Sequence, residues 1–164
     1  MDSKFLEFLI ITKKLNENNI VPLLMGSLGL EFVTKKSWDS QDIDIHVCGD
    51  PRGWSIPDEL VIYEWDKIVA IMNDLGYHLI DLHEHKFLKN KIEVGYGVIN
   101  TLPDFADVSD HELDCQTIDG IEFYTPSLYA FLKIYTSSSK DSYRANNNNN
   151  KDFEKINYLM SLVK

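Results

Sequence analysis

The stretch Ile20-Val21-Pro22-Leu23-Leu24-Met25-Gly26-Ser27 is followed, after an apolar segment and a polar loop, by Asp42-Ile43-Asp44-Ile45-His46-Val47. The first apolar run predicts a buried strand, which Gly26-Ser27 ends. Leu28–Val33 has the pattern of a helix start, and the polar segment Thr34–Gln41 predicts a loop. Asp42–Val47 alternates with a period of two, which is typical of a strand. This order of elements predicts an α/β fold.

Each part of this stretch suits phosphate and metal binding. A glycine after a strand lets a ligand approach the backbone closely, and the free amides at the start of the next helix form an anion site, to which Ser27 adds a hydroxyl. Asp42 and Asp44 lie two residues apart on a strand and share a face. Mg²⁺ commonly takes one or two carboxylates plus substrate phosphates. Glu93, isolated among apolar neighbours, is the candidate third carboxylate, which would allow two metals. A solvated acidic edge beside a common turn is the alternative at this point.

The segments on either side predict a small mixed sheet flanked by helices, with further helices at the C-terminal end. Helical periodicity appears in Asp2–Asn16, Trp65–Leu75, Ser127–Ser137 and Lys151–Val163, with one helical turn in Pro103–Val108. Strand patterns appear in Tyr77–Asp81, Glu84–Leu88, Lys91–Val98, Glu112–Ile118 and Ile121–Tyr124. Turn or loop signals appear in Gly49–Pro57, Lys89-Asn90, Asp119-Gly120 and Asn146–Asn150, the last of which predicts a mobile loop. With no internal repeat and no clear boundary, residues 1–164 are expected to form one domain.

Composition narrows the classes of function. Hydrophobic residues make up 44% and charged residues 26%, as in globular proteins. The net charge of -10 argues against non-specific nucleic-acid binding, although a single nucleotide arriving with a metal ion remains compatible with it. Cys48 and Cys115 fit no zinc spacing and no disulfide framework, and we expect two buried, reduced thiols. The start Met1–Lys4 lacks a signal-peptide pattern and no apolar run reaches membrane-spanning length, so we expect a cytoplasmic protein without membrane contact.

A family resemblance rests on the same residues. Leu24-Met25-Gly26-Ser27, the helix and loop, and Asp42-Ile43-Asp44-Ile45 together resemble the signature of the nucleotidyltransferase superfamily. The most similar members are small single-domain ones: lincosamide and aminoglycoside nucleotidyltransferases, and the nucleotidyltransferase partners of toxin–antitoxin pairs. Gly120–Ser127 is similar to the hairpin and proline that precede the family's first C-terminal helix. The basic or paired residues that resemble those of small members are Lys133, Lys140, Arg144 and Lys151-Asp152.

The resemblance implies metal-dependent transfer of a nucleotidyl group from an NTP to a hydroxyl acceptor, either a small molecule or a protein. It implies that Gly26 and Ser27 hold the triphosphate and that Lys140 and Arg144 touch phosphate or base. The implied ligands of Mg²⁺ or Mn²⁺ are Asp42, Asp44 and Glu93, and Glu93 is also a candidate base. Lys151 and Asp152 would tie the last helix to the body. Two departures bear on activity: the third acid is Glu where many members have Asp, and Gly29 weakens its helix by about 1 kcal/mol relative to Ala.

Two other classes of function stay open from the sequence. One is an inactive binding module or antitoxin-like partner that keeps the fold without turnover. The other is an interaction protein whose acidic pair is only surface. Small relatives often dimerise, so a homodimer is a further expectation from the resemblance. Residues weighed for lesser roles are His46 as acid or base, Trp38 as a stacking surface, His83 and His85 as surface or pocket histidines, and His111 with Ser109, which form no evident triad.

Overall fold

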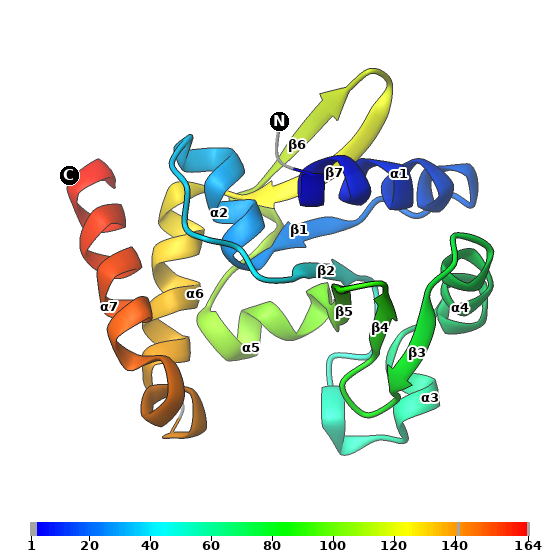
Figure 1. The fold of residues 1–164 in the computed structure, drawn as a ribbon. Coiled ribbons are helices and arrows are strands. Elements are labelled where there is room, and N and C mark those ends of the chain that lie inside the picture. The colour runs from blue at the N-terminus through cyan, green and yellow to red at the C-terminus, as the bar shows by residue number, and fades with distance from the viewer. Residues whose placement is uncertain (1–2, 141, 164) are drawn as a thin grey trace. The chain divides into compact units, whose positions relative to one another are not determined.

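The chain folds into two compact units, seen in a computed structural model that describes residues 3–140 and 142–163, with side chains for 3–140 and 152–163. The first unit runs up to Thr101 and takes in Cys115–Thr125. The second comprises Leu102–Asp114 and the residues from Pro126 onward. The element labels follow the chain from blue to red in Figure 1.

A seven-stranded mixed sheet organises the first unit, with the order β3-β4-β5-β2-β1-β7-β6. Strand β1 pairs antiparallel with β2 and parallel with β7, and β2 pairs parallel with β5. Strand β4 pairs antiparallel with both β3 and β5. The predicted small mixed sheet is therefore confirmed. The strands are β1 (Leu23–Met25), β2 (Ile43–Val47), β3 (His78–Asp81), β4 (Lys86–Lys89), β5 (Ile92–Val98), β6 (Leu113–Ile118) and β7 (Ile121–Pro126).

Helices α1 and α4 cover one face of this sheet and contact each other (Figure 1). That face carries the fully buried side chains Ile43 and Ile45 of the central strand β2. Phe8 of α1 meets Phe123 of β7 edge to face, with ring centroids 5.2 Å apart. Burial of this apolar face is the main contribution to the stability of the unit. Its helical elements are α1 (Ser3–Glu17), α2 (Gly26–Thr34), α3 (Asp58–Val61), α4 (Trp65–Asp74) and the 3-10 turns η1 (Gly53–Ser55) and η2 (Ile99–Thr101).

The second unit is helical. Its longest helices, α6 and α7, pack along each other. Phe131 and Tyr135 of α6 stack with ring centroids 6.0 Å apart, and Lys155 of α7 lies over the Tyr135 ring. Among the described residues of the chain, no helix has the length and apolar character to cross a membrane. The elements of the unit are α5 (Leu102–Ala106), the 3-10 turn η3 (Asp110–Glu112), α6 (Leu128–Lys140) and α7 (Ser142–Val163).

Several sequence predictions differ from the structure. The cysteines predicted to be buried, Cys48 and Cys115, are both exposed, because Cys48 follows the end of β2 and Cys115 lies in the edge strand β6. The first strand begins only at Leu23, because Pro22 has no N–H for the sheet ladder. The strand predicted from Glu84 begins at Lys86, because His85 has the left-handed φ of 53° that ends a turn. Helix α3 (Asp58–Val61) was not predicted, since the sequence indicates a loop up to Pro57 and the next helix only from Trp65. The bounds of α7 include Asn146–Asn150, where the sequence predicts a loop, and the side chains of these asparagines lie outside the described residues.

Candidate functional site

The strand register brings two of the predicted acids, Asp44 and Glu93, to one face of the sheet. Ile43 is paired with Val94 and Asp44 with Gly95 in the parallel ladder between β2 and β5. Glu93 lies in β5 one residue before Val94, whereas Asp42 immediately precedes the first residue of β2. Paired residues share a face, and residues two apart on a strand return to it. The face opposite the α1 and α4 layer therefore carries Asp44 and Glu93, and Asp42 lies beside its edge at the start of β2.

Gly26 places the start of α2 directly against Asp44. Met25 is paired with Asp44 across β1 and β2, and Gly26 follows with φ of 66°. A Cβ added to Gly26 would lie 3.1 Å from Asp44 Cβ and 3.4 Å from Asp44 Oδ2. The first residues of α2 carry backbone amides that point out of the helix, and the side chain of the N-cap residue Met25 makes no capping hydrogen bond. A phosphate-binding helix start and a carboxylate thus lie side by side.

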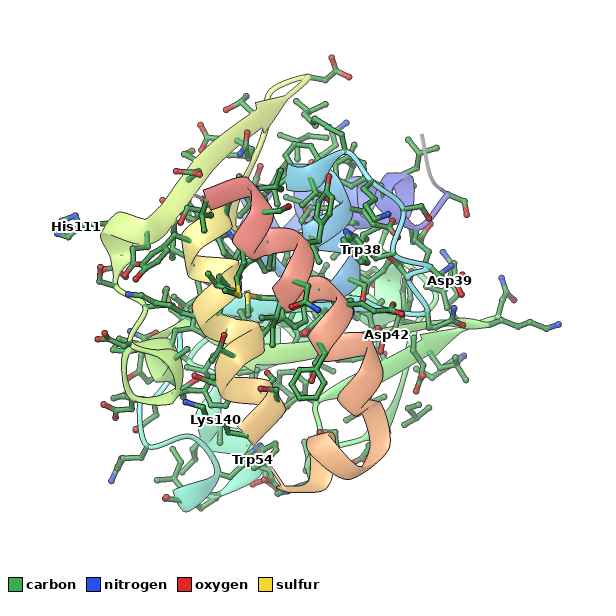
Figure 2. All side chains as sticks on the ribbon, turned by 90° about the vertical axis from the view of Figure 1, so that its left-hand side faces the viewer. Trp38, Asp39, Asp42, Trp54, His111 and Lys140 are labelled. Atoms are coloured by element: carbon green, nitrogen blue, oxygen red, sulfur yellow. The ribbon has the colours of Figure 1, made fainter. Side chains whose placement is uncertain are left out.

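The loop between the two halves of the motif is held by Glu31 of α2. Its Oε2 accepts hydrogen bonds from the backbone N–H groups of Trp38, at 2.8 Å, and Ser40, at 3.2 Å. The indole Nε1–H of Trp38 donates to Thr34 Oγ1 at 3.1 Å. These contacts fix the path of the chain that leads into Asp42. Figure 2 shows Trp38 and Asp42 along this loop, whereas Trp54 lies well away from them.

Sequence analysis missed two glycines on the same face. Gly95 and Gly97 of β5 are the partners of Asp44 and His46 of β2. Glycine inside a strand often marks a close approach of another group, and the alternation Gly95-Tyr96-Gly97 was the available signal. The role of Glu31 was also missed, because its partners are backbone amides whose direction no pattern of residue types discloses.

The basic candidates belong to the second unit. Lys140 is the exposed last residue of α6, and Arg144 falls within the bounds of α7, with a side chain outside the described residues. Their role at phosphate or base stays a prediction. Lys133 has a local structural role instead: its Nζ donates to Asp107 O at 2.8 Å and contacts Glu112 Oε2 at 3.1 Å. The hydrogen bond to Glu112 raises the pKa of Lys133.

The remaining residues weighed from the sequence have other surroundings. His83 Nδ1 lies 3.0 Å from Asp58 Oδ1, whereas His85 is buried with Nε2 2.8 Å from Asp58 O. Of the surface or pocket positions predicted for the two histidines, the surface position is confirmed for His83, whereas His85 is buried. Ser109 caps η3 by a reciprocal pair of hydrogen bonds with Glu112, which is a structural role. Asp152 is fully buried, and the side chain of Lys151 lies outside the described residues.

The donor set at Asp44 fits a cation shared with a phosphate ligand. Among the described residues, no three His, Cys, Asp or Glu side chains are grouped so that the protein alone could hold a metal. Mg²⁺ needs less, because it binds through one or two carboxylates and fills its shell with phosphate oxygens and water. The absence of a Cβ at Gly26 leaves room for such oxygens beside Asp44.

Comparisons with known proteins show the family and the fold of the chain. No protein-family model matches the chain. The uncharacterised protein YnaI from Bacillus subtilis (strain 168) is 38% identical over 159 residues, which cover 96% of each chain. The solution structure of the antibiotic-resistance factor ANT(2'')-Ia superposes with a TM-score of 0.67 at 15% identity, covering all of this chain and 86% of that one.

Two crystal structures share the fold as well. ANT(2'')-Ia in complex with adenylyl-2''-tobramycin has a TM-score of 0.60 at 13% identity, covering 94% of this chain and 86% of that one. An antigenic nucleotidyltransferase-like protein from Paracoccidioides brasiliensis has a TM-score of 0.58 at 14% identity, covering 94% and 73%. The chain therefore belongs to the family of YnaI, and its fold is that of the nucleotidyltransferase superfamily.

Proposed function

We propose that this protein transfers a nucleotidyl group from an NTP to a hydroxyl acceptor, with Mg²⁺ or Mn²⁺ as cofactor. One observation carries the proposal: the start of α2 lies against the Asp44 side chain, so close that a Cβ added to Gly26 would be 3.1 Å from Asp44 Cβ. Helix amides bind phosphate oxygens, and a carboxylate at the same place binds the cation that accompanies them. A solvated acidic edge would not require the start of a helix to lie beside the carboxylate.

The residues have separate tasks in this reaction. Gly26 and Ser27 hold the outer phosphates, and Asp42 with Asp44 holds the divalent cation. The cation neutralises phosphate charge and polarises the α-phosphate when it is bound. Glu93 takes the proton of the acceptor hydroxyl as the acceptor oxygen bonds to the α-phosphorus. The bond from that phosphorus to the bridging oxygen breaks, and pyrophosphate leaves.

The proposal also covers the contacts to the NTP, the class of acceptor and the oligomeric state. Lys140 and Arg144 are proposed to contact phosphate or base. Since ANT(2'')-Ia has been crystallised with an adenylylated aminoglycoside, a small molecule with a free hydroxyl is the favoured acceptor class, with a protein side chain as the other. The net charge of -10 favours a neutral or cationic acceptor over RNA. We also propose that residues 1–164 act as one cytoplasmic domain, and that a homodimer forms.

Thermal unfolding with Mn²⁺ and each NTP tests the site. The comparison is between the native chain, Asp42→Ala/Asp44→Ala, and a charge-matched control, Glu59→Ala/Asp74→Ala, whose acids are exposed on α3 and α4. At a hundredfold excess over Kd, binding stabilises the folded state by about 2.7 kcal/mol, which is a rise of several degrees. We expect that rise in the native chain and the control only. Equal rises of the unfolding midpoint in all three proteins would show that Asp42 and Asp44 do not bind the ligand.

Turnover separates an enzyme from a binding module with the same fold. We expect pyrophosphate release from Mn²⁺ and NTP when a suitable hydroxyl acceptor is present, and its loss in Glu93→Gln. Nucleotide binding without pyrophosphate release, across a panel of small-molecule and protein acceptors, would support the inactive module or the antitoxin-like partner instead.

A further inference from the structure

His46 is the second polar side chain on the site face of β2. It lies two residues after Asp44, and its Nε2 is 3.6 Å from Asp44 Oδ1. The His46 side chain is 17% exposed and the Asp44 side chain 43%, so the imidazole lies on the inner side of the carboxylate. At 3.6 Å the contact is longer than a hydrogen bond, but contacts of this kind commonly shorten when a site is loaded.

Gly97 is what gives the imidazole its place. A Cβ added to Gly97 would lie 2.5 Å from His46 Nε2, 2.8 Å from Cδ2 and 2.9 Å from Cε1, distances at which the ring would have to move. Gly95, two residues earlier on the same face, differs: the nearest atom to its added Cβ is Lys86 Cγ, at an ordinary 3.8 Å. Glycine inside a strand costs roughly 0.5–1 kcal/mol relative to Ala. At Gly97 the absence of a side chain leaves the space that the His46 ring occupies, which offsets this cost.

Burial selects the tautomer of His46. Its Nδ1 is buried and has no hydrogen-bond partner among the described residues. A buried N–H without an acceptor costs roughly 1–3 kcal/mol, whereas Nε2 has a carboxylate oxygen in front of it. The proton of a neutral imidazole is therefore favoured on Nε2, where it points toward Asp44. In metal sites, outer hydrogen bonds of this kind fix the direction in which a ligating carboxylate faces.

We propose that His46 is a positioning residue, which holds the Asp44 carboxylate toward the start of α2 by donating from Nε2, and that Gly97 is required to seat it. The inference rests on the proposed function, because Asp44 must be a cation ligand for its direction to matter. Within that function it adds a fixed partner for Asp44 on the side away from the phosphates.

Manganese affinity of the purified full chain tests the proposal without turnover. Binding of Mn²⁺ together with a non-hydrolysable NTP analogue is measured by isothermal titration calorimetry, for native protein and four variants. His46→Leu keeps bulk but removes the donor, and His46→Gln restores a donor. Gly97→Ala displaces the ring with His46 intact, and Gly95→Ala is its matched control on the same strand and face.

We expect Mn²⁺ affinity to fall about tenfold in His46→Leu and Gly97→Ala, and to stay within about threefold of native in His46→Gln and Gly95→Ala. Native-like affinity in both His46→Leu and Gly97→Ala would overturn the inference while leaving the proposed function intact. A native chain that binds no Mn²⁺ in the presence of the analogue overturns the proposed function itself. Unfolding midpoints check that each variant folds, and if His46→Leu does not, the Gly97→Ala and Gly95→Ala pair decides.

Discussion

At the residue scale, Gly26 combines an unusual backbone conformation with a close neighbour. Its φ is 66°, a region that costs an L-residue roughly 1–2 kcal/mol, and its absent Cβ faces Asp44 at 3.1 Å. We predict that Gly26→Ala lowers the free energy of unfolding by about that amount and abolishes the stabilisation by Mn²⁺ and NTP. The second effect follows because the methyl group would separate the α2 amides from the carboxylate. Urea unfolding with and without ligand measures both.

Gly120 supplies the matched control for that substitution. It has φ of 79° in the turn between β6 and β7, and a Cβ added to it would meet nothing within 4 Å. Gly120→Ala should therefore show a similar loss of stability, from backbone strain alone, with the ligand response intact. If Gly120→Ala also loses the stabilisation by Mn²⁺ and NTP, the effect at Gly26 comes from general destabilisation. The close approach of Gly26 to Asp44 would then have no special role in ligand binding.

At the scale of elements, one polar cluster ties α1 to the end of the sheet that carries β3 and β4. Glu7 Oε1 accepts hydrogen bonds from Tyr77 Oη at 2.7 Å and from Lys89 Nζ at 3.0 Å. Burial raises the pKa of Glu7, but these two donors outweigh it, so the pKa lies below its usual value. Burial, followed by the bond to Glu7, raises the pKa of Tyr77.

The lowered pKa of Glu7 predicts a specific acid dependence of stability. A carboxylate with a depressed folded-state pKa stabilises the fold above its unfolded pKa, and the contribution is lost as the pH falls through the folded pKa. We expect the difference in free energy of unfolding between the native chain and Glu7→Gln, on the order of 1 kcal/mol at neutral pH, to shrink as the pH falls from about 5. Urea titrations across this range measure it. A difference that is constant with pH would mean that the Glu7 charge is not what stabilises the cluster.

The same elements show what the sequence could predict. The pair Asp119-Gly120 predicts a tight hairpin because both residues accept positive φ, and the structure has φ of 51° and 79° there. Alternation predicts β2 because one face of that strand is buried. The register that brings Glu93 to the face of Asp44 and the contact between His46 and Gly97 could not be predicted. They depend on strand pairing between segments far apart in the sequence, which local pattern does not encode.

At the scale of the whole molecule, the net charge of -10 should make stability depend on salt. Like charges repel more in the compact state than in the unfolded chain, and the Debye length shortens from about 30 Å at 0.01 M salt to about 8 Å at 0.15 M. We predict that NaCl added over this range raises the unfolding midpoint by roughly 2–4 °C, which corresponds to about 1 kcal/mol. A midpoint that is unchanged or lower in salt would mean that the acidic groups are locally compensated.

One series of unfolding experiments, in NaCl and in MgCl₂, distinguishes screening by salt from binding of Mg²⁺ at the site. Asp42→Ala/Asp44→Ala and Glu59→Ala/Asp74→Ala each remove two negative charges, so their response to NaCl should be alike. MgCl₂ at matched ionic strength should give the native chain and the Glu59/Asp74 variant an additional rise, because a divalent ion held by carboxylates adds binding energy to screening. The Asp42/Asp44 variant should show only the NaCl response. The same additional rise in all three would place the Mg²⁺ effect on the diffuse acidic surface rather than beside α2.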